Sequence, residues 1–232
     1  MVQKGIHPTA IISDSAKLGK NVEIQGYVVI NSNVAIGDNS VIGSHSVIGA
    51  SAFNEDVKQN SGLVIGQNVW IGSHVNVQCG TKAPASIGDN CRINHGCRIG
   101  HDVKIEENCE VGLGASISGH SKIEAGSSIG PNAVITNRVK MGKRSRVGIG
   151  SLVLNDIPTN STVIGSPAEE LSIYKRKNKK IRNLINEDRK TRRVNSASGR
   201  LSLLKPLLKP LYLILPKKLK YIIRIGLDKF NG

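Results

Sequence analysis

Two histidines, each beside a residue with its own chemistry, are the strongest candidates for catalysis in this sequence. His101 is followed by Asp102, and His120 is preceded by Gly119. A neutral imidazole can take a proton from an attacking hydroxyl or amine near physiological pH. We expect Asp102 to support His101, although adjacent residues of a strand point to opposite faces, which argues against direct contact. The elements that carry these residues decide whether they meet.

A six-residue repeat supplies those elements. An aliphatic residue recurs at every sixth position over residues 6–48, 65–77 and 87–153, and a small or β-branched residue follows it four positions later. Glycine recurs one position after the aliphatic residue, and each such glycine would destabilise a helix by about 1 kcal/mol. Short strands joined by tight turns fit this period. We predict an all-β fold, a left-handed parallel β-helix with three-sided coils.

The repeat also places the two histidines. His101 lies two residues after Ile99 and His120 lies three residues after Ile117, and eighteen residues, one full coil, separate these two aliphatic positions. Adjacent coils are about 4.8 Å apart. Both imidazoles are therefore predicted to project from the same side of the coil toward one substrate, with His101 as the general base.

The cysteines show no such clustering on the outside. Cys91, Cys97 and Cys109 each lie four residues after an aliphatic position, at the small inward site of the repeat. We interpret them as core thiols and expect neither a disulfide framework nor a metal site.

Two insertions interrupt the repeat, near residues 49–64 and 78–86, and loops on a rigid scaffold commonly carry binding residues. With the opening IHPTAI segment, the Gly-Thr loop, the His-Asp pair and the Gly-His pair, the sequence resembles the UDP-N-acetylglucosamine acyltransferases of lipid A synthesis. It is also similar to the sialic-acid and bacillosamine-type sugar acetyltransferases. The resemblance spans residues 5 to 170, and it implies a homotrimer that transfers an acyl group from a thioester to a sugar hydroxyl or amine.

The resemblance also implies roles for single residues. The backbone N–H of Gly119 would bind the oxyanion, and His120 would contact the acceptor sugar. His95, in the segment INHGC, matches the Asn-His motif of the acetyltransferases and is the alternative to His101, although its spacing of 24 residues to Gly119 fits poorly. Trp70 points outward from its coil, where it could stack on a sugar or adenine, or pack at a subunit contact.

The end of the repeat resembles the part of these families that binds the acyl donor. Ile149 takes the place of the small glycine that sets acyl length in the lipid A enzymes, and the third histidine of that family is absent from the corresponding segment AVITNRV. We therefore predict acetyl-CoA as donor, with a long chain on acyl-carrier protein as the alternative. Lys140 and Lys143 could meet phosphates or belong to a basic outer face. The predicted donor-binding residues are Gly130, Lys140, Lys143, Gly148, Ile149, Pro167 and Ala168.

Charge divides the chain into two parts. Residues 1–170 hold 14 Lys or Arg and 14 Asp or Glu, whereas residues 171–232 hold 18 and 3. We predict a β-helix domain over 1–170 and a basic, partly helical extension over 171–232. Leucines and isoleucines alternate with lysines in 201–227, which suits the anionic inner face of a membrane or packing against the trimer. Nucleic acid is not expected, because no reading motif or aromatic platform accompanies the charge.

Two classes of function follow. The first is an acetyltransferase that modifies a nucleotide-linked or lipid-linked sugar of a bacterial surface glycan. The second is a non-catalytic structural β-helix subunit, which would not need the histidine pairs beside two loops. The sequence shows no charged and apolar export segment at residues 1–10, so we expect a cytoplasmic protein, or one attached peripherally to the inner face of the membrane.

Overall fold

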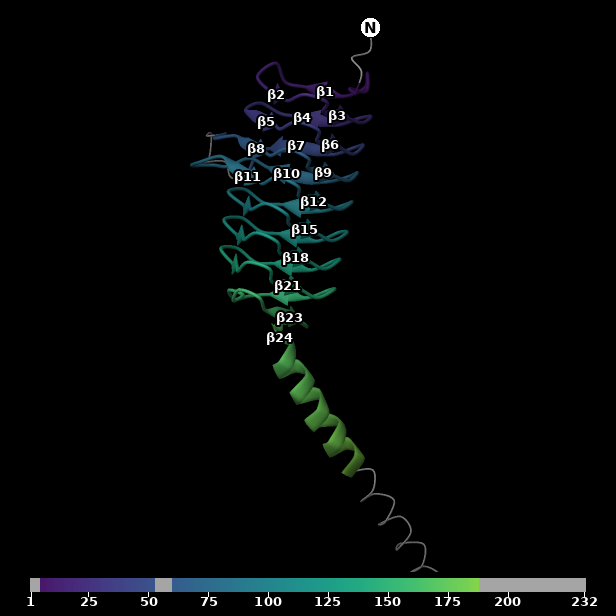
Figure 1. Cartoon of the computed structure of the whole chain (residues 1–232), viewed down its shortest axis with the longest axis vertical. Helices are drawn as coiled ribbons and strands as arrows, with labels where there is room; N and C mark the ends of the chain where they lie inside the picture. Colours follow the sequence, from purple (N-terminus) through teal and green to yellow (C-terminus); the bar gives the residue numbers. More distant parts are fainter. Residues whose placement is uncertain (1–4, 53–59, 188–232) are drawn as a thin grey trace, which may run out of the picture. The chain divides into compact units, whose positions relative to one another are not determined.

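The computed structural model describes residues 5–52 and 60–187 (Figure 1). The chain divides into two units, Met1–Lys175 and Arg176–Gly232, and each is considered by itself. The first unit is an all-β parallel solenoid, which confirms the predicted β-helix of hexapeptide repeats. The predicted membrane-contacting segment, 201–227, lies outside the described residues.

Three sheets form the sides of the solenoid, parallel except for the last strand pair of sheet 3, and the chain visits them in turn. Sheet 1 contains β1 (Ile11–Ile12), β4 (Val29–Ile30), β7 (Val47–Ala50), β10 (Asn76–Gln78), β13 (Arg98–Ile99), β16 (Ser116–Ile117), β19 (Val134–Ile135) and β22 (Leu152–Val153). Sheet 2 contains β2 (Lys17–Leu18), β5 (Val34–Ile36), β8 (Leu63–Ile65), β11 (Ala85–Ile87), β14 (Lys104–Ile105), β17 (Lys122–Ile123) and β20 (Lys140–Met141). Sheet 3 contains β3 (Glu23–Ile24), β6 (Val41–Ile42), β9 (Trp70–Ile71), β12 (Arg92–Ile93), β15 (Glu110–Val111), β18 (Ser128–Ile129), β21 (Arg146–Val147), β23 (Thr162–Ile164) and β24 (Glu169–Glu170).

Identical positions of the repeat stack on one another from coil to coil. Ile99 of β13 pairs with Ile117 of β16, eighteen residues later, as the repeat predicts. The insertions lengthen this spacing without shifting the aliphatic register, because Ile36 still pairs with Ile65 and Ile65 with Ile87. Both insertions leave the solenoid at the corner between sheets 1 and 2, called corner 1–2 here.

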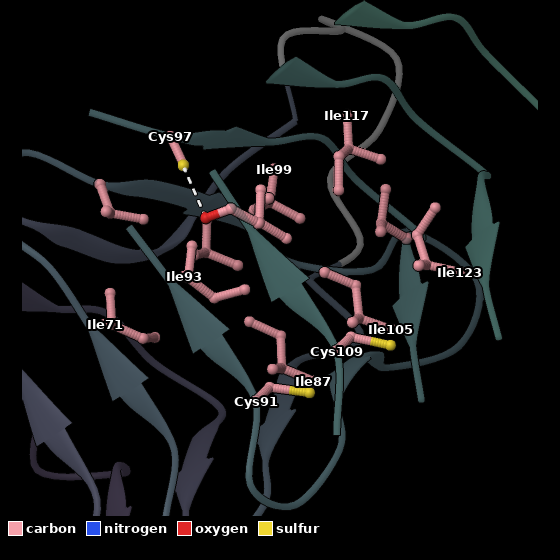
Figure 2. Close-up of a cluster of buried hydrophobic side chains, with 14 of the residues drawn as sticks. Ile71, Ile87, Cys91, Ile93, Cys97, Ile99, Ile105, Cys109, Ile117 and Ile123 are labelled. Carbon is pink, nitrogen blue, oxygen red and sulfur yellow. Dashed lines mark hydrogen bonds between the residues drawn. The ribbon is translucent and has the colours of Figure 1, made fainter. Parts of the chain in front are cut away.

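The core is a column of isoleucines with small side chains between them (Figure 2). Ile71 and Ile93 are fully buried, and the three cysteines at the small inward positions are at most 2% exposed. Burial raises the pKa of the Cys97 thiol, which keeps it protonated and unreactive. The prediction that Cys91, Cys97 and Cys109 are core thiols is confirmed.

The corners turn through residues with positive φ, a backbone conformation that favours glycine and asparagine. At corner 2–3, between sheets 2 and 3, Asn21, Asn39, Asn68 and Asn90 occupy this position and hydrogen-bond to one another in a ladder, with N···O distances of 3.1 to 3.4 Å. At corner 3–1 the equivalent residues of three N-terminal coils are rings. Tyr27, His45 and His74 stack there with centroids 5.0 Å apart.

Beyond the last strand the chain forms a helix over residues 171–187, where the described part of the chain ends. This helix confirms that the extension is partly helical. Among the described residues, no helix is long and apolar enough to cross a membrane.

Candidate active site

His101 and Asp102 form the centre of the site, in the turn between β13 and β14 at corner 1–2. His101 Nδ1 lies 2.8 Å from Asp102 Oδ2. The expectation that the two residues would point to opposite faces is wrong, because they lie in a turn and not in a strand. Asp102 has φ of 56°, and this positive φ turns its carboxylate back toward the preceding imidazole.

The loop after β10 holds the Asp102 carboxylate. The Thr81 N–H donates to Oδ1 at 2.9 Å, the Thr81 hydroxyl donates to Oδ2 at 2.7 Å, and the Lys82 N–H lies 3.4 Å from Oδ1. Burial acts to raise the pKa of Asp102, but the hydrogen bonds from His101, Thr81 and Lys82 outweigh it and hold that pKa well below its ordinary value. The carboxylate is therefore ionised at neutral pH and accepts the proton on His101 Nδ1.

The other insertion supports this loop in turn. The Ser61 hydroxyl donates to the Thr81 carbonyl at 3.0 Å, and the backbones of Gly62 and Gly80 pair in an antiparallel bridge. The two loops thus contact each other directly. A chain of hydrogen bonds leads from Ser61 through Thr81 and Asp102 to His101, crossing three successive coils.

His120 and Gly119 lie one coil below, in the turn between β16 and β17. The rings of His101 and His120 meet edge to face, with centroids 4.8 Å apart and planes at 87°. His120 Nδ1 is 3.8 Å from Asp102 Oδ2, so one carboxylate faces both histidines. The prediction that His101 and His120 project from the same side is confirmed.

Gly119 lies directly against the His101 ring. A Cβ atom at this position would come within 2.8 Å of His101 Nε2, so only glycine leaves the imidazole in place. Within the described part of the chain, the Gly119 N–H donates no hydrogen bond. Gly119 therefore combines a close approach to the His101 ring with a backbone N–H that has no acceptor among the described residues.

This arrangement suits proton transfer at one nitrogen. Asp102 fixes the His101 tautomer with the proton on Nδ1, which leaves the lone pair on Nε2, and Nε2 has no hydrogen-bond partner among the described residues. The side chains of His101 and His120 are 33% and 35% exposed, so a substrate can reach both.

The same three side chains have the composition of a metal site. His101, Asp102 and His120 each offer a ligand atom, and these atoms lie within 4.8 Å of one another. The hydrogen bond between His101 and Asp102 already satisfies one ligand atom of each. The absence of a metal stays a prediction.

His95 and Trp70 lie elsewhere on the solenoid. Trp70 is in β9 of sheet 3, and His95 follows β12 at corner 3–1, with the two rings edge to face at 5.3 Å. Arg92 lies over the Trp70 ring at 5.7 Å. His95 Nδ1 accepts the Ser73 N–H at 2.9 Å, so this histidine braces the turn of the preceding coil. The structure does not bring His95 or Trp70 to His101.

Two of the predicted donor-binding glycines line a groove of 470 Å³ over sheet 3 near corner 3–1. Gly112, Gly130 and Gly148 line it, together with Glu110 and Arg146 from strands β15 and β21. The adjacent Ile149 is 73% exposed. The groove and the His101 turn therefore occupy different corners of the same chain.

The remaining donor-binding candidates are dispersed. Lys140 lies in β20 of sheet 2, with its Nζ 3.3 Å from Glu124 Oε1, and Lys143 lies in the turn that follows. Pro167 and Ala168 precede β24, and the Ala168 N–H donates to the Leu152 carbonyl. These residues do not share a pocket with His101 among the described residues.

Thr81 and Lys82 were not among the sequence-predicted site residues. The insertion between β10 and β11 breaks the eighteen-residue spacing, so periodicity alone does not place Thr81 above Asp102. The available signal was the position of this insertion, which leaves the solenoid at the corner where His101 lies.

The chain matches two protein-family models. The bacterial transferase hexapeptide (six repeats) model matches residues 6–50 and 84–119, and the hexapeptide repeat of succinyl-transferase matches residues 62–100. No curated protein matches in sequence.

Solved structures show the same architecture. LpxA from Acinetobacter baumannii is 26% identical with a TM-score of 0.66, and the match covers 72% of this chain and 73% of that one. The UDP-N-acetylglucosamine acyltransferase from Campylobacter jejuni is 28% identical, with a TM-score of 0.59 and coverage of 71% and 73%. The enzyme of that name from Francisella novicida is 27% identical, with a TM-score of 0.57 and coverage of 71% and 69%.

Proposed function

We propose that this hexapeptide-repeat β-helix is an acyltransferase, and that it transfers an acetyl group from acetyl-CoA to a sugar of a bacterial surface glycan. The observation that carries the proposal is the His101–Asp102 pair, 2.8 Å apart and braced by Thr81. A purely structural solenoid has no need for an oriented imidazole whose outer nitrogen faces solvent. The acyltransferase names of the similar structures support the same class of reaction.

His101 acts as the general base in this proposal. Its Nε2 takes the proton from the acceptor hydroxyl or amine as the acceptor oxygen or nitrogen attacks the thioester carbonyl. Asp102 stabilises the imidazolium that forms, because its carboxylate is already ionised and hydrogen-bonded to Nδ1. The tetrahedral intermediate then expels the thiolate, which takes the proton back from Nε2. The products are the acylated sugar and free thiol.

Gly119 and His120 complete the site. Gly119 lies against the His101 ring, and its N–H would donate to the oxyanion of the tetrahedral intermediate. His120 lies against the same carboxylate and orients the acceptor sugar. The acceptor is a nucleotide-linked or lipid-linked sugar, and a homotrimer would place the site between neighbouring subunits.

We propose that the acyl donor binds in the groove over sheet 3. Gly130 and Gly148 allow a pantetheine arm to lie close to the backbone, and the exposed Ile149 beside them takes the position of the glycine that, by the resemblance, sets acyl length in the lipid A enzymes. This favours acetyl-CoA over a long chain on acyl-carrier protein. Lys143 and Lys140 would meet the phosphates of coenzyme A, and Pro167 and Ala168 would also contact the donor, although none of the four lines this groove within one chain.

A thiol-release assay on the purified full chain tests the proposal. Acetyl-CoA and a long-chain hydroxyacyl carrier protein are compared as donors against a panel of nucleotide-linked sugars. We expect turnover with acetyl-CoA, and a fall in kcat/KM of about 10²- to 10⁴-fold in His101→Ala. His74→Ala, which removes an exposed histidine at corner 3–1, is the matched control and should retain activity.

Each other result has a defined meaning. Turnover only with the carrier-bound long chain would replace the acetyl donor by the lipid A type of donor. Activity that is unchanged in His101→Ala but lost in His95→Ala would identify His95, at corner 3–1, as the general base. No thiol release with any donor and acceptor pair, from a protein that remains folded, would favour the non-catalytic β-helix.

A further inference from the structure

The helix over residues 171–187 has one apolar face whose side chains remain partly exposed. At about 3.6 residues per turn, its exposed large apolar side chains fall within a sector of about 120°. These side chains are between 37% and 55% exposed. We call this set the apolar stripe: Ile173, Tyr174, Ile181, Leu184 and Ile185.

The opposite side of the helix is cationic. Residues 171–187 contain six Lys or Arg and one Glu. On the helical wheel, five of the six basic residues lie outside the sector of the apolar stripe, with Lys180 next to its edge, whereas the sixth, Lys177, lies within it between Leu184 and Ile181. We call this set the basic face: Lys175, Arg176, Lys179, Lys180 and Arg182.

From this arrangement we propose that the helix lies in the interface of an anionic membrane, with the apolar stripe in the acyl region and the basic face among the headgroups. An exposed apolar stripe beside a Lys- and Arg-rich face is the pattern of an interfacial helix. The helix is about 25 Å long and too polar to span a bilayer, so it lies parallel to the surface.

The charge of the helix favours an anionic membrane, and not a second copy of the chain, as the partner of the apolar stripe. Packing two apolar stripes together would bring two basic faces of the same sign alongside each other, with Lys180 at the edge of the contact. Negative headgroups neutralise this charge instead, and each Lys or Arg near such a surface favours binding by about fivefold. The inference does not depend on the acyl-transfer proposal, because it rests on residues outside the candidate active site.

Vesicle sedimentation of the full chain tests the inference, with vesicles of pure phosphatidylcholine and vesicles that also contain phosphatidylglycerol. We expect binding to the anionic vesicles only, and reversal by high salt. The double variant Ile181→Gln with Leu184→Gln should weaken binding by about tenfold or more, because two apolar side chains leave the acyl region. Glutamine preserves helix propensity, so the helix itself is retained.

A matched double variant on the polar side, Asn183→Gln with Asn186→Gln, introduces the same residue type and should bind as the unmodified chain does. Removing two charges, with Lys175→Gln and Lys179→Gln, should weaken anionic binding by about fivefold per charge. Absence of vesicle binding would overturn the inference, and so would binding that the Ile181 and Leu184 changes leave intact. A change of sedimentation coefficient in that variant without any vesicle binding would assign the stripe to self-association instead.

Discussion

At the scale of single residues, the candidate site depends on how Asp102 is held. Four hydrogen-bonding groups converge on this one carboxylate, from His101, Thr81 and Lys82, and they come from two successive coils. The imidazole is therefore oriented before any substrate arrives. The orientation requires the positive φ of Asp102, which brings adjacent side chains together in a way that a strand would not.

The first prediction concerns Asp102→Asn. Because the folded-state pKa of this carboxyl lies below its unfolded value of about 3.9, its contribution to stability is present above that pH and is lost as the pH falls. We expect the variant to be less stable by about 1 kcal/mol at pH 7, measured by urea unfolding, and the difference to shrink below about pH 4. A difference that stayed constant from pH 7 to pH 3.5 would contradict the role of the ionised carboxylate.

The second prediction concerns the contact between Gly119 and His101. Gly119→Ala would place a methyl group 2.8 Å from His101 Nε2 and displace the ring. We expect kcat to fall by about 10²-fold, in thiol release, because the base loses its position. The control is Gly26→Ala, whose Cβ meets the exposed His7 ring at 3.3 Å far from this turn. Equal losses of activity in both variants would indicate general disruption.

The position of each histidine in the six-residue repeat distinguishes His101 from His95 as the candidate base, whereas residue type alone does not. Both lie two residues after an isoleucine of the repeat, but six residues separate them, which is one side of a three-sided coil. His95 is therefore placed one corner away from His101, whereas His120, one coil further along, falls on the same corner. The direct contact between His101 and Asp102 could not be predicted, because the period does not give the φ of a turn residue.

At the scale of elements, the two insertions contribute rigidity to corner 1–2. The loop after β10 binds Asp102 through Thr81, and the loop before β8 binds Thr81 through Ser61. The sequence shows where these loops leave the solenoid, because the repeat stops and resumes around them. It does not show which loop atoms reach the next coil, since the path of a loop follows no period.

Thr81→Val tests this support. Valine keeps the shape of the side chain and removes the hydroxyl that donates to Asp102 at 2.7 Å. We expect kcat to fall about tenfold while KM for the donor changes little, because His101 is less well oriented and donor binding is untouched. Thr9→Val removes a hydroxyl that accepts the Tyr27 N–H at the N-terminal end of the solenoid, and it should leave kcat unchanged. A similar fall in both variants would refute the positioning role of Thr81.

At the scale of the whole molecule, the solenoid is predictable from the sequence because every coil repeats the same pattern of buried aliphatic and small residues. The aliphatic positions of the repeat become the buried column, and the small positions fill the space between them. Each coil contacts only its neighbours, so the free energy of unfolding is approximately a sum over the coils and the interfaces between adjacent coils. The relative placement of the helix over 171–187 follows no such repeat.

Substitutions along the column test this picture. Ile93 is fully buried in the middle of the solenoid, whereas Ile12 in the first strand is only partly buried. We expect Ile93→Val to reduce the free energy of unfolding by about 0.5–1.5 kcal/mol, and Ile12→Val to reduce it less, in matched urea titrations. Equal effects would mean that the first coil is packed as tightly as the central ones.

The last coil carries a consequence for assembly. Parallel stacking leaves a row of unpaired amides and carbonyls at the end of every sheet, and such a row can template another molecule. Here residues 157–170 cross all three ends: Ile157 bridges to Met141, Gly165 and Ala168 pair with Leu152, and β24 runs antiparallel to β23. Because β24 is antiparallel and Ile157 forms only an isolated bridge, a second solenoid meets no regular parallel strand in the described residues at this end. Head-to-tail growth into fibres is blocked there, and the sides of the solenoid remain for contacts between copies.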